Sequence, residues 1–285
     1  MTVKIAAKEI SLNVTDIRKT YDGVGAQLNV SLPAGAAVSA ADEAAILASV
    51  TLTSDNGSTY AADHTFTDRT SEHITASAAA ANYRIADATT DVVINARPVS
   101  VYYSDSPLTA VYDELAHALT PTVEPENRQA NTGLLDASFG HVATATPDAN
   151  ATQTNVTNGQ IEAGFASVVI RDASGNDVTG NYAVSTTSGR IEITQAASFE
   201  LELNSYADVY DGDAHAVSVK SVTDAAKRVI PLDRYDWTFN GVATFTQTDA
   251  GYTTVTVVGH SKQPANYPDV RGTASIDIAK RPRSA

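Results

Sequence analysis

The chain has 285 residues, of which 43% are hydrophobic, and a formal net charge of −14. This length allows two or three domains, and the hydrophobic content excludes a globally disordered chain. The acidic balance argues against a nucleic-acid or anionic-membrane binder, since both need a basic surface. The absence of cysteine excludes disulfides, thiolate metal sites and cysteine nucleophiles. No apolar run approaches the ~20 residues of a membrane helix, so no membrane insertion is expected.

In chain order, alternating apolar and polar residues predict strands almost throughout. Successive side chains of a strand face opposite ways, so this alternation is typical of strands with one buried face. The clearest runs are residues 28–32, 191–193, 199–204, 254–257 and 276–278, and turn signals occur at 54–58, 172–177 and 187–189. One segment differs. Residues 39–48 begin with Ser39, continue with acids and good helix formers, and predict a short helix that crosses between strands.

Two dipeptides recur and alternate along the chain: three Tyr-Asp pairs, at Tyr21, Tyr112 and Tyr210, each precede one of three Asn-Tyr pairs, and a further Tyr-Asp at Tyr235 lies outside this order. An isoleucine follows the asparagine of each Asn-Tyr pair by twelve residues. Such self-similarity is the signature of a repeat architecture. The motif residues are Tyr21, Asp22, Gly23, Asn82, Tyr83 and Ile94; then Tyr112, Asp113, Asn181, Tyr182 and Ile193; then Tyr210, Asp211, Gly212, Asn266, Tyr267 and Ile278.

The motif order predicts three tandem domains, at residues 7–96, 97–195 and 196–283, which we call the first, second and third repeats. The linkers between them are short and lack the Gly/Ser richness of a flexible tether, so each repeat is expected to contact its neighbours. Residues 1–6 are expected to end a preceding repeat and 281–285 to begin a following one. The chain is therefore interpreted as a piece of a longer array.

The number and length of the strands predict an all-β fold. Several short strands in each stretch of about 90 residues favour three tandem small β-sandwich (Ig-like) domains in an elongated rod. The alternative is a set of β-grasp-like repeats, each with a short crossing helix.

The repeated motifs are interpreted as structural. The tyrosine is expected to plug the end of the core while the aspartate caps a turn. On this interpretation Tyr210→Ala would cost about 3 kcal/mol, as loss of a buried aromatic does. Glu114 stands where the other two copies have Gly23 and Gly212, which questions whether this position needs a positive φ.

No metal or cofactor is predicted. His117 and His215 both lie five residues after the repeat tyrosine and are interpreted as half-exposed strand residues, since a metal site needs several converging ligands. Calcium is the alternative at two acidic turns, but neither has EF-hand spacing, so solvated hairpins are favoured. These turns contain Asp172, Asn176 and Asp177, and Asp211 and Asp213.

No catalytic signature is present, so the chain is predicted not to be an enzyme. It lacks a GxSxG elbow with a placed histidine and acid. A glycosidase needs a deep cleft between two carboxyl groups, and domains of this size rarely form one.

The motifs resemble the small all-β repeats of large bacterial surface proteins, known as YDG or MBG-type repeats of Gram-positive adhesins. The matching residues are the three Tyr-Asp corners and the stretches 177–193, 246–259 and 266–282. The resemblance implies an extracellular protein displayed at the cell wall or cell surface, with adhesive or spacer roles. Some Gram-positive surface domains also carry a Lys–Asn crosslink. The second repeat has no lysine for one, whereas the third has Lys220, Lys227, Lys262 and Lys280.

Two functions are compatible with this pattern. The first is a non-catalytic stalk that projects a distal binding region, as a monomer whose repeats contact one another. The alternative is that one domain itself binds a host glycan or protein through exposed aromatic residues, at Tyr235–Trp237 or at Tyr102 and Tyr103.

The predicted rod can be tested by its size. Each sandwich should add about 30–40 Å, because strands of about 8–11 residues rise about 3.3 Å per residue. Three in line would approach about 100 Å. Small-angle X-ray scattering would contradict the rod if the radius of gyration were near the ~19 Å of one compact domain of this length.

Overall fold

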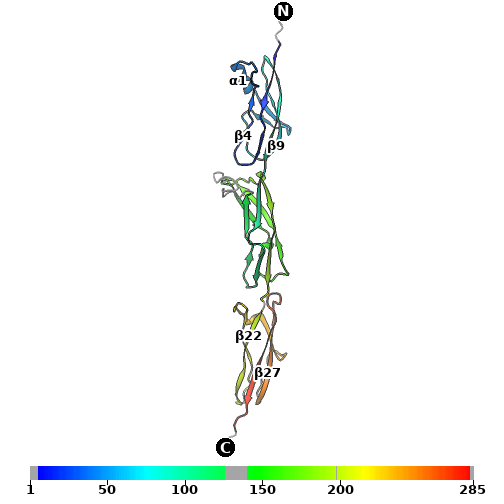
Figure 1. The fold of residues 1–285 in the computed structure, drawn as a ribbon. Helices are drawn as coiled ribbons and strands as arrows, with labels where there is room; N and C mark the ends of the chain where they lie inside the picture. The colour runs from blue at the N-terminus through cyan, green and yellow to red at the C-terminus, as the bar shows by residue number, and fades with distance from the viewer. Residues whose placement is uncertain (1–5, 126–139, 197, 283–285) are drawn as a thin grey trace, which may run out of the picture. The chain divides into compact units, whose positions relative to one another are not determined.

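The computed structural model describes residues 6–125, 140–196 and 198–282, which form an all-β chain of tandem sandwich domains with one short α-helix (Figure 1). Within these ranges no helix is long and apolar enough to cross a membrane. Of the segments 1–6 and 281–285, which were predicted to belong to neighbouring repeats, residues 1–5 and 283–285 lie outside the described residues. The chain divides into two compact units. Unit 1 is Met1–Tyr102, Pro121–Pro147 and Phe165–Thr187; unit 2 is Tyr103–Thr120, Asp148–Gly164 and Ser188–Ala285.

In unit 1 the first repeat is built on a five-stranded sheet. Its order is β3 (Ile17–Thr20), β11 (Ala88–Asn95), β9 (Thr70–Ser77), β6 (Thr51–Ser54) and β7 (Thr59–Ala61). Three strand pairs accompany it: β1 (Lys8–Ser11) with β10 (Tyr83–Ala86), β2 (Asn13–Val14) with β5 (Val30–Ser31), and β4 (Ala26–Gln27) with β8 (Thr65–Phe66).

The predicted crossing helix is confirmed as α1 (Ala40–Ala48), which connects β5 to β6 (Figure 1). The side chain of Ser39 caps it by accepting a hydrogen bond from the backbone N–H of Asp42 at 3.1 Å. The helix anchors itself through Ile46, which is fully buried in the core.

The rest of unit 1 comes from the second repeat. Here β12 (Arg97–Tyr103) lies between β15 (Pro121–Pro125) and β20 (Tyr182–Thr186), and β16 (Val142–Pro147) pairs with β19 (Phe165–Arg171). A 3-10 turn, η3 (Thr179–Asn181), precedes β20. The buried core of the first repeat continues into these strands through residues that include Val99, Val101, Ile170 and Tyr182.

Unit 2 contains further strands of the second repeat and all strands of the third. The strands from the second repeat form a three-stranded sheet in the order β13 (Leu108–Val111), β21 (Gly189–Thr194), β18 (Ile161–Ala163). They also form the pair β14 (His117–Ala118) and β17 (Thr152–Gln153), and a 3-10 turn, η2 (Ala149–Ala151), precedes β17. The strands of the third repeat form two sheets. The first has the order β22 (Phe199–Asn204), β24 (Ser218–Asp224), β25 (Val229–Ile230). The second has the order β23 (Tyr206–Val209), β28 (Val270–Ala279), β27 (Gly251–Ser261), β26 (Tyr235–Phe239), and a 3-10 turn, η4 (Leu232–Arg234), precedes β26.

The third repeat shows why the fold is a sandwich. Leu203 of β22 and Val219 of β24 pack on the same buried cluster as Val255, Val257 and Ile276 of the other sheet. The alternation predicted for 199–204 is confirmed, because Phe199, Leu201 and Leu203 are the less exposed residues of β22. The β-grasp alternative is wrong, since the strands face one another across a core in two sheets.

One pairing is common to all three repeats. The strand before each repeat tyrosine runs parallel to the strand that carries the repeat isoleucine, as β3·β11, β13·β21 and β23·β28. The backbone N–H of each tyrosine then donates to the carbonyl of the residue after that isoleucine. These N···O distances are 2.8, 2.8 and 2.9 Å for Tyr21, Tyr112 and Tyr210. The isoleucines are almost fully buried, so the pairing ties the tyrosine to the end of a buried strand.

Candidate functional site

Each repeat tyrosine opens a three-residue corner with the same turn. The aspartate carboxylate accepts a hydrogen bond from the N–H two residues later, at 3.0 Å for Asp22, 2.9 Å for Asp113 and 2.9 Å for Asp211. Such a side-chain turn closes locally without help from the rest of the sheet. The same local hydrogen bond therefore forms in every copy.

The last residue of each corner, directly after the aspartate, has a left-handed backbone conformation. The φ angles are 76° at Gly23, 69° at Glu114 and 94° at Gly212. The doubt raised by Glu114 is thus resolved: the position does need a positive φ, even where no glycine fills it. A non-glycine residue in this region is strained, so the glutamate needs a compensating interaction.

Two of the three tyrosines are covered by the following repeat. In unit 1, Tyr21 packs edge-on against Tyr182 with ring centroids 5.6 Å apart and planes at 76°. In unit 2, Tyr112 packs against Tyr267 in the same way, at 5.2 Å and 80°. All four rings are at most 6% exposed. We call these contacts the first joint and the second joint; each brings the corner of one repeat against the Asn-Tyr turn of the next.

The asparagines complete the joints with matching amide contacts. At the first joint, the Asn181 amide donates to the Asp68 carboxylate and its oxygen accepts from the Arg69 N–H, both at 2.8 Å. At the second, the Asn266 amide donates to the Asn155 side chain and its oxygen accepts from the Val156 N–H, both at 3.0 Å. Asn181 and Asn266 are 7% and 8% exposed, so both amides are buried with their bonds satisfied.

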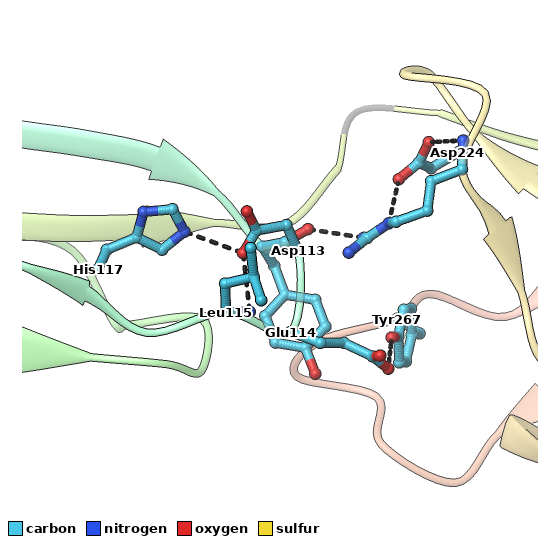
Figure 2. Close-up of polar contacts among 8 residues, drawn as sticks. Asp113, Glu114, Leu115, His117, Asp224 and Tyr267 are labelled. Carbon is cyan, nitrogen blue, oxygen red and sulfur yellow. Dashed lines mark hydrogen bonds and ion pairs between the residues drawn. The ribbon is translucent and has the colours of Figure 1, made fainter.

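The buried phenols also have partners. Tyr182 Oη lies 2.7 Å from His141 Nδ1, and burial lowers the pKa of His141, which favours a neutral ring that accepts the phenol hydrogen. Tyr267 donates to Glu114 Oε1 at 2.5 Å, as Figure 2 shows. Burial raises the pKa of Tyr182, and burial with Glu114 raises that of Tyr267, so both phenols remain protonated donors.

Guanidinium groups bind the corner carbonyls. Arg228 donates to the Tyr112 carbonyl at 2.9 Å and is held by the buried Asp224 carboxylate at 3.0 Å, in the region drawn in Figure 2. Arg97 reaches the Tyr21 carbonyl at 3.4 Å. Arg234 adds a 3.1 Å contact to Glu114, so this glutamate is bound by two groups of the third repeat.

The two histidines belong to the corners. His117 Nε2 lies 2.9 Å from the Asp113 carboxylate, and His215 Nε2 lies 2.9 Å from the Asp211 carboxylate. The contact with His215 holds the pKa of Asp211 below its usual range. Both histidines are partly buried, as predicted. Among the described residues no group of three His, Asp or Glu side chains gathers as a metal site would require.

The terminal copies of the motifs are exposed. Tyr210 is 37% exposed, so the expectation that it plugs a core, with a cost of about 3 kcal/mol on truncation, is wrong. Asn82 is exposed as well, and Tyr83 is half-buried, with its hydroxyl donating to Asp42 at 2.8 Å. The sequence shows the same motif three times, whereas burial depends on which neighbour covers it.

The remaining candidate residues have local roles. The carboxylate of Asp172 accepts the N–H groups of Ser174 and Asn176 and closes its own hairpin turn. The lysines considered for a crosslink in the third repeat lie at the surface, where Lys220 pairs with Glu202. Lys227 pairs with Glu200 and Lys262 with Asp236 in the same way.

Neither a protein-family model nor a curated protein matches the sequence. Solved structures match it at low identity. Extracellular cadherin domains 3–6 of protocadherin gamma B2 are 9% identical, with 97% of this chain and 72% of that chain covered and a TM-score of 0.33. The N-terminal eight Ig domains of the Down syndrome cell adhesion molecule are 10% identical over 95% and 42% of the two chains, with a TM-score of 0.27.

A protein of the Bacteroides ovatus mixed-linkage glucan utilization locus, solved with a mixed-linkage heptasaccharide, is 13% identical. Here 94% of this chain and 67% of that chain are covered, with a TM-score of 0.23. Scores this low support no inference about function.

The Asn-Tyr turn at Asn266 is buried in the second joint, whereas the turn at Asn82 is exposed, so the same substitution at both positions provides a matched test of the joint. Asn266→Ala should lower the free energy of unfolding by about 1–3 kcal/mol, because it leaves the Val156 N–H without its acceptor. Asn82→Ala should change it by less than about 0.5 kcal/mol, because that side chain is exposed. Differential scanning calorimetry of both variants measures the difference. Equal effects would show that the second joint contributes no stability.

Proposed function

We propose that this chain is a non-catalytic spacer region of an extracellular bacterial surface adhesin with YDG or MBG-type repeats, and that it projects a distal binding region. One observation carries the proposal: the residues shared by the repeats form the contacts between repeats. Tyr21 and Tyr112 are covered by Tyr182 and Tyr267 instead of lining an open site. Neighbouring repeats are thus the first partners of these motifs.

The joints have the properties that a spacer needs. A spacer must resist bending where its domains meet, and each joint combines a perpendicular aromatic pair with buried hydrogen bonds. The connection at the first joint is also short, because β11 ends at Asn95 and β12 starts at Arg97. A single intervening residue restricts the angles that two domains can adopt.

A distance measurement tests the spacer role. The chain has no cysteine, so Thr109→Cys and Thr254→Cys, both at exposed strand positions in unit 2, can carry two spin labels. Double electron–electron resonance should give a single narrow distance distribution across the second joint. Glu114→Gly removes the side chain that binds Tyr267 but keeps a corner sequence found in the other repeats, and it should broaden the distribution. A distribution that is already broad without this substitution would contradict the proposal.

A groove in the third repeat favours a second candidate function, binding of a host glycan or protein by one domain. The groove has a volume of about 620 Å³ and is lined mainly by apolar side chains, including Tyr235, Trp237, Phe239 and Phe245. Among the described residues the buried Tyr235 hydroxyl has no hydrogen-bond partner. Aromatic walls with a few polar groups are typical of ligand sites.

Trp237 reports directly on this groove because it is the only tryptophan. If the groove binds a glycan, titration of the full chain with an oligosaccharide panel should change the Trp237 emission in a saturable way. Phe245→Ala should weaken that change, whereas Tyr252→Ala, at a 67% exposed ring outside the groove, should not. Unchanged emission with every sugar would remove glycan binding at this groove.

A further inference from the structure

The corner of the third repeat has the form of the other two corners but lacks their cover. The Asp211 carboxylate closes the same turn, and Gly212 has the same left-handed backbone. The Tyr210 N–H makes the same bond to the end of the last strand. The ring of Tyr210, however, is 37% exposed, against 3% for Tyr21 and 6% for Tyr112. The three corners therefore have the same local structure, and the exposure of Tyr210 differs because no following repeat covers its ring within the described residues.

The surface beside this corner also carries the positions that receive the asparagine at the joints. At the first joint, Asp68 and Arg69 directly precede Thr70, the residue paired with Ile94. At the second, Asn155 and Val156 directly precede Thr157, whose N–H donates to the Ile193 carbonyl.

In the third repeat, Gly251 pairs with Ile278, so the corresponding residues are Asp249 and Ala250. Asp249 supplies a carboxylate, as Asp68 does, and Ala250 supplies a backbone N–H. Within the described part of the chain, neither the Asp249 carboxylate nor the Ala250 N–H has a hydrogen-bond partner. Both groups that bind the asparagine amide are therefore present and available.

The sequence after the last strand matches the start of the second repeat. Arg97 and Pro98 follow Ile94 by three and four residues, and Arg281 and Pro282 follow Ile278 by the same spacing. Arg97 donates to the carbonyl of the corner tyrosine Tyr21. Arg281 occupies the equivalent position relative to Tyr210.

We propose that the surface formed by Tyr210, Gly212, Asp249 and Ala250 is the receiving half of a third joint. Its occupant is the Asn-Tyr turn of another repeat of the same kind. The inference rests on the proposed spacer function for its biological meaning, but its physical basis is continuity with the two joints already described.

The corner sequence selects the type of repeat that fits. At the second joint Glu114 supplies the partner for the Tyr267 hydroxyl, but Gly212, like Gly23, has no side chain to do so. The repeat that docks on Gly23 brings its own partner, His141, for Tyr182. The incoming repeat should therefore resemble the second repeat, with an internal partner for its tyrosine.

The experiment extends the full chain by one repeat: residues 1–280 are followed by a second copy of residues 97–195. Only the third repeat contains a tryptophan, so Trp237 emission follows its unfolding in both chains. In the natural chain, Tyr210→Ala and Asp249→Ala should each shift its melting temperature by less than ~2 °C, as exposed substitutions do. In the extended chain each should lower it by at least ~4 °C, as loss of a buried contact does. Equal shifts in the two chains would overturn the proposal.

A control in the added copy tests the other half of the contact. Asn181→Ala confined to the added copy should remove most of the extra sensitivity to Asp249→Ala, because the amide is the proposed partner of that carboxylate. Sensitivity that persists unchanged would contradict the proposed pairing. Circular dichroism per residue checks that the added repeat folds. If the added repeat does not fold, the same measurements are made on a chain extended by residues 97–282, in which Trp237→Phe in the added copy keeps a single tryptophan in the chain.

The result is distinguishable from failure of the spacer proposal. The spin-label measurement concerns the second joint, whereas the extended chain concerns only the surface at Tyr210. A narrow distance distribution with no effect of extension would leave the spacer proposal standing and reject the third joint.

Discussion

Burial of a tyrosine hydroxyl is the constraint on which the joints depend. A buried phenol must keep a hydrogen-bond partner, and the edge-on contact between two rings covers the apolar part of each. The two joints meet this demand differently. Tyr182 uses His141 of its own repeat, whereas Tyr267 uses Glu114 of the preceding one. Because the aromatic pair stays the same while the polar partner changes, the ring contact is the fixed element and the hydrogen bond is adapted to it.

Glu114 is an exception to the preference for glycine at a backbone position with positive φ. A left-handed non-glycine residue costs about 1–3 kcal/mol, which a glycine at the same place would avoid. Glu114 has a φ of 69° in a corner where its side chain binds both the Tyr267 hydroxyl and Arg234. A charged hydrogen bond to a buried phenol is of a size that offsets this strain. The departure from the glycine pattern is therefore explained by the neighbouring repeat and not by the corner itself.

The sequence was sufficient for what is decided locally. Alternation predicted β22, the Ser39 cap predicted α1, and the constant spacing from Asn to Ile marked the buried strand ends. It was not sufficient for contacts between copies, because a repeated motif looks the same whether its partner lies in its own repeat or in the next. That is why Tyr210 was expected to be buried and was found exposed. One signal was present: an amide and an aromatic ring side by side in every copy suggest a specific polar contact more than core filling.

The pattern of exposure along the chain also separates a joint from a ligand site. A receptor site repeated three times would be open in all three copies, since each copy would need the same exposed groups. The corners instead are buried at Tyr21 and Tyr112 and open at Tyr210, while the Asn-Tyr turns are open at Asn82 and buried at Asn181 and at Asn266. The exposed corner is the last of the three and the exposed Asn-Tyr turn is the first, as expected when each corner is covered by the turn of the following repeat.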